Sequence, residues 1–127
     1  MGSIGRPRAL MARAIYIPER GDAIWLDFDP QAGREQAGRR PALVLSRSTY
    51  NRKSGLALVC PITSQIKGYP FESLVPADLP IQGVVLTDQI RCLDWHRRHA
   101  KFIIRIPDNL LQDVTAKLSA LLGLGDD

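Results

Sequence analysis

The chain has 127 residues, 45% of them hydrophobic and 24% charged, a balance typical of one globular domain with an apolar core. Its 17 Lys and Arg residues exceed its 13 Asp and Glu residues, and the formal charge of +4 suits an anionic partner such as nucleic acid. No apolar stretch reaches the ~20 residues of a membrane span, and two cysteines cannot build a disulfide framework. We therefore expect a cytoplasmic protein without membrane contact, in which Cys60 and Cys92 are buried free thiols.

Residues 1–17 are expected to be an N-terminal tail or a cloning remnant, and residues 18–127 a single domain. The first predicted strand shows apolar residues at period two, and the third is apolar almost throughout, which favours burial on both faces. A polar turn is predicted over residues 50–55. The expected strands cover residues 23–28, 41–45, 56–62, 71–75, 83–86 and 100–106.

The C-terminal segment changes to a helical period. One apolar stripe runs through Leu110, Leu111, Val114, Leu118, Leu121 and Leu122. Pro107 suits the first turn of this helix, and Gly123 suits the left-handed position after its end. Short strands followed by one helix predict a mainly β fold, a small bent sheet or barrel with a helix packed on it.

The loop between the first two predicted strands has a composition that suits phosphate binding better than core packing. It carries Glu35, Arg39 and Arg40 together with two glycines. Arginine offers a planar fork of donors that matches phosphate, and a glutamate can move a proton. The alternative interpretation is that these charges only solvate a flexible loop.

A second polar loop follows the third predicted strand and carries Thr63, Ser64, Gln65 and Lys67. If the second and third strands are neighbours, the two loops meet at one end of the sheet. Together they offer cations, hydroxyls and a carboxylate. RNA cleavage needs no more, because the ribose 2′-hydroxyl is the nucleophile and the protein only moves protons and stabilises charge.

The histidines do not make a convincing metal site. His96 and His99 are three residues apart, but Arg97 and Arg98 stand between them and no carboxylate or cysteine cluster completes a ligand shell. A solvated basic turn is favoured, and we expect neither a metal nor another cofactor. Trp95 is expected to be partly buried, with base stacking as the alternative.

The two loops and their flanking strands carry a family resemblance. The motifs are Gly21-Asp22-x-Ile24-Trp25-x-Asp27-Phe28-Asp29-Pro30, Gly33-x-Glu35-Gln36-Ala37-Gly38-x-Arg40-Pro41-Ala42, Tyr50-Asn51, Thr63-x-Gln65-x-Lys67-Gly68-Tyr69-Pro70-Phe71-Glu72, Asp88-Gln89-Ile90 and Trp95. With these motifs, residues 18–123 resemble the MazF/PemK family of toxin endoribonucleases.

The resemblance implies the SH3-like barrel of CcdB, MazF and PemK toxins, with a C-terminal helix, in a homodimer. It implies a toxin of a type II toxin–antitoxin system, an mRNA interferase. Such an enzyme cleaves single-stranded mRNA at specific sequences without a metal, leaving a 2′,3′-cyclic phosphate and a 5′-hydroxyl. The implied partners are RNA and a cognate MazE-like antitoxin, with operator DNA bound only through the antitoxin complex.

Carried over by position, Arg40 and Thr63 match the family's catalytic pair and Glu35 its loop carboxylate. Arg40 would stabilise the phosphate and could also donate a proton to the leaving oxygen, although an arginine stays protonated far above neutral pH, which favours charge stabilisation. Thr63 would hold the phosphate by a hydrogen bond. Glu35 would act as general base or only order the loop. The implied RNA-binding residues are Gln36, Arg39, Ser64, Gln65, Lys67 and Tyr69, of which Arg39 and Ser64 stand where the family varies and would tune sequence preference.

Two other functions stay open at this point. The first is a CcdB-like, non-catalytic poison of DNA gyrase, but that mode depends on a tryptophan near the C-terminus, and residues 122–127 have none. The second is a non-catalytic RNA-binding barrel, supported only by charge. The apolar stripe of the C-terminal helix and residues 84–93 are the candidate dimer interface.

Overall fold

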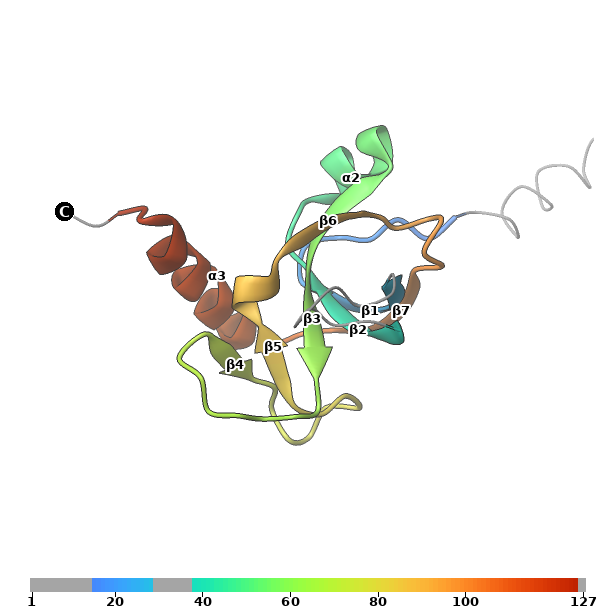
Figure 1. The fold of residues 1–127 in the computed structure, drawn as a ribbon. Coiled ribbons are helices and arrows are strands. Elements are labelled where there is room, and N and C mark those ends of the chain that lie inside the picture. Colours follow the sequence, from blue (N-terminus) through green and yellow to red (C-terminus); the bar gives the residue numbers. More distant parts are fainter. Residues whose placement is uncertain (1–14, 29–37, 126–127) are drawn as a thin grey trace, which may run out of the picture.

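The computed structural model describes residues 15–28 and 38–125 (Figure 1). The strands are β1 (Asp22–Phe28), β2 (Gly38–Val44), β3 (Leu56–Thr63), β4 (Glu72–Leu74), β5 (Val84–Leu86), β6 (Arg91–Asp94) and β7 (Lys101–Arg105). The helices are α2 (Ser48–Ser54), the 3-10 turn η2 (Thr87–Gln89) and α3 (Asp108–Leu122).

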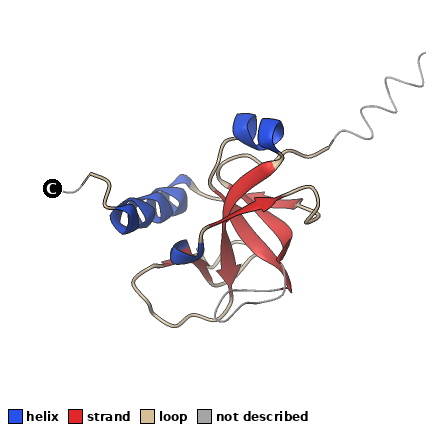
Figure 2. Cartoon of the chain, turned by 45° about the horizontal axis from the view of Figure 1, so that its top comes forward, coloured by secondary structure: helices blue, strands red, loops and turns tan. Residues whose placement is uncertain are grey.

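The strands form one strongly bent antiparallel sheet in the order β4-β5-β3-β2-β1-β7, and β6 also pairs with β3. The sheet curls into a barrel-like shape, with α3 to one side of it (Figure 2). The ladder from β4 to β7 stays open among the described residues. The predicted mainly β fold with a C-terminal helix is confirmed.

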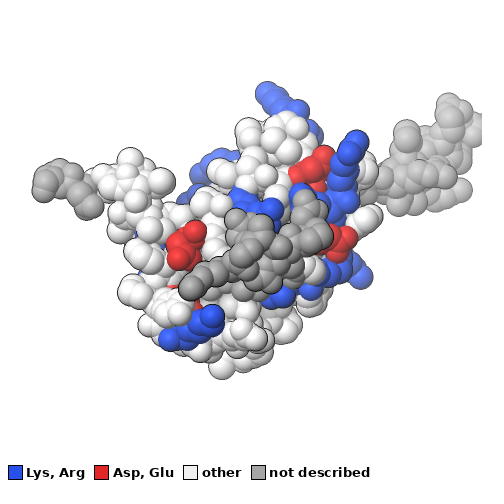
Figure 3. Space-filling view, in the orientation of Figure 1, with Lys and Arg blue, Asp and Glu red and all other residues white. Residues whose placement is uncertain are grey.

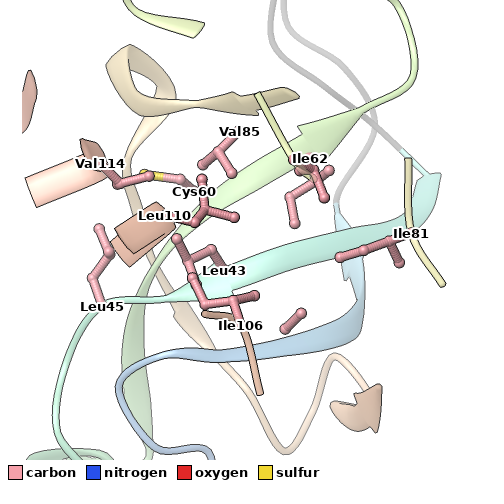
Figure 4. Close-up of a cluster of buried hydrophobic side chains, with 11 residues drawn as sticks. Leu43, Leu45, Cys60, Ile62, Ile81, Val85, Ile106, Leu110 and Val114 are labelled. Carbon is pink, nitrogen blue, oxygen red and sulfur yellow. The ribbon is translucent and has the colours of Figure 1, made fainter. Parts of the chain in front are cut away.

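Alternate residues of β2 and β3 enter two separate apolar clusters, because successive side chains of a strand point to opposite faces. Leu43 and Cys60 belong to the cluster that α3 covers, which Figure 4 draws. Ala42 and Val59 belong to the second cluster, on the other face of the same strands. The expectation that the third strand is buried on both faces is confirmed except near its start, where Leu56 is half-buried and Leu58 is exposed.

Helix α3 packs its apolar stripe against the core as far as Leu118. Leu110 and Val114 are buried against the sheet. Leu121 and Leu122 are exposed at the C-terminal end of the helix. Gly123 follows with a φ of +72°, the left-handed conformation expected of a residue that ends a helix.

The predicted polar turn over residues 50–55 is wrong, since Ser48–Ser54 forms α2. This helix has no apolar stripe, and long-range polar contacts hold it instead. The buried Asn51 side chain donates to the carbonyl oxygens of Pro18 at 2.8 Å and Ser46 at 3.0 Å. The Asn51 carbonyl oxygen accepts the Trp95 indole N–H at 2.9 Å.

The two cysteines differ in environment. Cys60 is buried, as expected, and burial raises the pKa of its thiol to about 12. The prediction for Cys92 is wrong, because its side chain is exposed on β6. Cys92 pairs with Leu58 across the sheet, and both side chains are exposed, although the Tyr50 hydroxyl of α2 lies 3.9 Å from the Cys92 Sγ. Trp95 is buried, so its ring cannot stack with bases.

Candidate active site

The N-terminal end of β2 and the C-terminal end of β3 lie at the same edge of the sheet. The last paired residues of the β2–β3 ladder are Ala42 and Pro61. Continued by two residues, this register places Arg40 opposite Thr63. Both residues then fall on the sheet face that carries Ala42 and Val59, because side chains alternate along a strand. The condition that the second and third predicted strands are neighbours is therefore met.

Thr63 ends β3 and is fixed by its surroundings. It pairs with Val84 of β5, and only 6% of its surface is exposed. Its Oγ1 accepts the backbone N–H of Gln65 at 3.2 Å. A hydroxyl that accepts one hydrogen bond still has its own proton to donate. Thr63 can therefore donate to an anionic oxygen from a defined position.

Gly83 lies against Thr63 so closely that no side chain fits in its place. A Cβ atom on Gly83 would lie 1.9 Å from the Thr63 carbonyl oxygen and 2.8 Å from the Ser64 Cα. Its φ of +115° also excludes most other residues. This contact could not be predicted from the sequence, because a glycine at the start of a strand does not reveal which backbone approaches it.

The β3–β4 loop (residues 64–71) follows Thr63 directly and carries most of the expected RNA-binding side chains on its surface. The exposed candidates there are Ser64, Gln65, Lys67 and Tyr69. The Lys67 Nζ lies 5.9 Å from the centre of the Tyr69 ring, within the range of a cation–π contact. The loop thus offers a cation and an aromatic face side by side.

Arg39 is already engaged within the protein. Its Nη1 donates to Asp27 Oδ1 at 2.8 Å, and its Nη2 donates to the carbonyl oxygen of His99 at 2.9 Å. His99 Nδ1 lies 2.7 Å from Asp27 Oδ2. The hydrogen bond from Arg39, and to a lesser extent the one with His99, holds the pKa of Asp27 below its usual value. These contacts join the ends of β1 and β2 to the turn between β6 and β7.

A further arginine, which sequence reasoning missed, belongs to the same face as the candidate pair. Arg91 pairs with Val59 across β3 and β6, so its side chain shares the face of Val59. Its guanidinium carbon lies 5.6 Å from the centre of the Phe28 ring at the end of β1. Only its position in the sheet, and no sequence pattern, associates Arg91 with this edge.

Lys and Arg side chains gather on the side of the molecule where Figure 1 labels β1, β2 and β7 (Figure 3).

Glu35 and Gln36 lie outside the described residues. No group of three or more His, Cys, Asp or Glu residues within 15–28 and 38–125 is arranged to hold a metal ion. In the same part of the chain, no helix is long and apolar enough to cross a membrane.

Comparison with known proteins gives consistent matches along most of the chain. Residues 19–122 match the family model described as the PemK-like, MazF-like toxin of type II toxin–antitoxin systems. The endoribonuclease toxin MazF of Escherichia coli K12 is 46% identical over 108 residues, which cover 85% of this chain and 96% of that protein. The endoribonuclease PemK of Escherichia coli is 37% identical over 82% of this chain and 81% of its own length.

Solved structures give the same relationship. The crystal structure of MazF from Deinococcus radiodurans is 52% identical, covers 87% of this chain and all of its own, and superposes with a TM-score of 0.83. A MazE–MazF crystal structure from the same organism gives 51% identity over the same shares and a TM-score of 0.80. The family model spans far more than half of the 127 residues. The chain therefore belongs to the PemK-like, MazF-like toxin family of type II toxin–antitoxin systems.

Proposed function

We propose that this chain is an endoribonuclease toxin that cleaves single-stranded RNA without a metal ion. The observation that carries the proposal is the β2–β3 register, which directs Arg40 and Thr63 to one edge of the sheet beside the exposed β3–β4 loop. Membership in a family whose matched relatives are named endoribonucleases gives independent support.

In the proposed reaction the ribose 2′-oxygen attacks the adjacent phosphorus. The new 2′-O–P bond forms as the P–O5′ bond breaks, which leaves a 2′,3′-cyclic phosphate and a 5′-hydroxyl. A base takes the proton of the 2′-hydroxyl, and water, or alternatively the Arg40 guanidinium, gives a proton to the departing 5′-oxygen. We assign the first transfer to Glu35 on the basis of the family resemblance, with ordering of its loop as the alternative role.

Arg40 and Thr63 stabilise the charge that develops on the phosphate oxygens. An arginine side chain stays protonated far above neutral pH, so stabilising charge suits Arg40 better than donating a proton. The Thr63 hydroxyl, oriented by the Gln65 N–H, donates to a non-bridging oxygen. Donors that are fixed before the reaction stabilise the transition state most, because they need no reorganisation as charge develops.

RNA binding is assigned to the β3–β4 loop and its neighbours. Lys67 would attract the phosphate backbone and the exposed Tyr69 ring would stack with a base. Ser64, Gln65 and Gln36 would contribute hydrogen bonds. Arg39 commits two of its five N–H donors to Asp27 and His99, which fixes the direction of its guanidinium, so we assign it an influence on sequence preference.

We also propose that the toxin is a homodimer neutralised by a MazE-like antitoxin, and that operator DNA is bound only through the antitoxin complex. Helix α3 contacts both β4 and η2, and exposed apolar side chains mark this side of the molecule. They are Leu74, Ile90, Leu121 and Leu122. Sedimentation at micromolar concentration would refute the dimer if it showed only a 14.1 kDa species.

The decisive experiment incubates the protein with a long single-stranded RNA in EDTA and maps the new ends. We expect cleavage by wild type and a loss of about 10²-fold or more in Arg40→Ala and Thr63→Ala. Arg52→Ala, an exposed arginine on α2, is the matched control and should cleave normally. Intact RNA with wild type, or full cleavage by both active-site variants, would overturn the proposal. Gyrase inhibition with intact RNA would point to the CcdB-like mode.

A further inference from the structure

A carboxylate outside the expected RNA-binding set holds the β3–β4 loop. Glu72, the first residue of β4, accepts the backbone N–H of Gly68 at 2.8 Å through Oε1. The Lys67 N–H lies 3.2 Å from Oε1 and 3.1 Å from Oε2 of the same carboxylate. Two consecutive backbone N–H groups that converge on one anion form a nest, and Gly68 has the left-handed φ, +80°, that such a turn uses.

Glu72 is itself attached to rigid parts of the fold. It pairs with Leu86 in the β4–β5 ladder, and its N–H donates to the Tyr69 carbonyl oxygen at 3.1 Å. Its carbonyl oxygen accepts the Lys117 Nζ of α3 at 2.8 Å. The carboxylate therefore ties the loop to a strand whose position is fixed on two sides.

We propose that Glu72 is a positioning residue for RNA recognition, and this inference rests on the proposed endoribonuclease function. Its carboxylate fixes the backbone at Lys67 and Gly68, so that Gln65, Lys67 and Tyr69 meet the RNA in one arrangement. Without it, two backbone N–H groups lose their acceptor and the loop takes up other conformations in the free protein. The free energy needed to order the loop on binding then lowers the affinity for RNA, and a loop with several conformations discriminates less between bases.

A purely electrostatic role for Glu72 predicts a change of KM in the opposite direction. If Glu72 acted only as a negative charge near RNA, removing it would lower KM, because a repulsive charge would be gone. If it acted only on global folding, the apparent kcat would follow the fraction of folded protein and KM would stay unchanged. Positioning predicts a higher KM with kcat preserved, since Arg40 and Thr63 lie on β2 and β3 and not on the loop.

The test compares Glu72→Ala and Glu72→Gln with wild type on an RNA oligonucleotide that contains a mapped cleavage site. We expect KM to rise about tenfold in Glu72→Ala, the effect of losing one well-made hydrogen bond to a charged group, with kcat within about twofold. Glu72→Gln should fall between, because its amide oxygen keeps one acceptor. End mapping on a long RNA should show additional cleavage sites in both variants.

Asp108→Asn is the matched charge control. It removes an exposed carboxylate from the first turn of α3, nine residues before Lys117. Its KM should stay within about twofold of wild type, because an exposed charge away from the loop contributes little. An unchanged or lower KM in both Glu72 variants would refute the inference, and so would a fall in kcat at unchanged KM.

Hydrogen exchange separates this inference from the proposed function. The Lys67 and Gly68 amides should exchange faster in both Glu72 variants than in wild type, whether or not the protein cleaves RNA. Equal exchange rates would contradict the positioning role directly. Intact RNA after incubation with wild type would instead refute the endoribonuclease proposal, and the ranking of RNA affinities by fluorescence anisotropy would then test the role of Glu72 in binding alone.

Discussion

Gly83→Ala should impair catalysis more than its effect on stability explains. The new Cβ would lie 1.9 Å from the Thr63 carbonyl oxygen, whereas real Cβ contacts stay above 3.0 Å, so the two backbones must separate by 3.0 − 1.9, about 1.1 Å. The substitution therefore pushes the Thr63 backbone, and with it the Thr63 hydroxyl, away from its position in the wild type. A displacement of about 1 Å in a reacting group can lower a rate about 10²-fold. We therefore expect kcat to fall about 10²-fold in steady-state cleavage of saturating RNA.

The control for backbone strain is Gly55→Ala. Gly55 also has a positive φ, +76°, but no atom lies within 4 Å of the position that its Cβ would take. It should lose roughly 1–2 kcal/mol of stability from the left-handed backbone alone and keep its kcat. In a double-mutant cycle, Gly83→Ala should add little to Thr63→Ala, because both act through one hydroxyl. A folded Gly83→Ala protein with the kcat of Gly55→Ala, or losses that simply multiply, would refute the reasoning.

Three further measurements test the fold and its charges. Leu110→Ala should lower the free energy of unfolding by about 2–4 kcal/mol, whereas the exposed Leu122→Ala should change it by less than about 0.5 kcal/mol in the monomer, as measured by urea denaturation. A thiol reagent should modify Cys92 in the native protein and Cys60 only after unfolding, as counted by intact mass. Because Arg39 and His99 lower the pKa of Asp27, its ionised form stabilises the fold above an unfolded-state pKa of about 3.9, and this contribution is lost as pH falls through the lower folded-state value. The difference in Tm between wild type and Asp27→Asn should therefore be largest near neutral pH and disappear in acid; a difference that grows on acidification would contradict this sign.

The sequence could predict those elements whose side chains repeat with a clear period. The alternation in β1 and the helical stripe of α3 are local patterns, so both segments were identified with small shifts of their ends. Helix α2 has no such stripe, and its buried Asn51 is satisfied by carbonyl groups from distant segments. The exposure of Cys92 could not be predicted either, because an apolar run does not reveal which of its side chains the fold leaves exposed.

Some contacts of the candidate site could likewise be predicted from the sequence, and others could not. The meeting of the Arg40 and Thr63 segments could be predicted once β2 and β3 were taken as neighbours, because antiparallel pairing brings the start of one strand to the end of the other. The contacts of Gly83 and Glu72 could not be, since both depend on how β4 and β5 fold back onto the end of β3. The engagement of Arg39 with Asp27 and His99 depends likewise on a turn sixty residues away along the chain.

The arrangement around β3 implies a separation between chemistry and recognition that kinetics can detect. Thr63 is fixed by the β5 pairing and by Gly83, whereas the loop that follows it is fixed by Glu72 from β4. Perturbing the first set moves a donor that acts on the transition state, so it should lower kcat. Perturbing the second set loosens contacts made equally in the bound and transition states, so it should raise KM and leave kcat unchanged. The boundary between these two effects should lie between Thr63 and Lys67, only four residues apart along the chain.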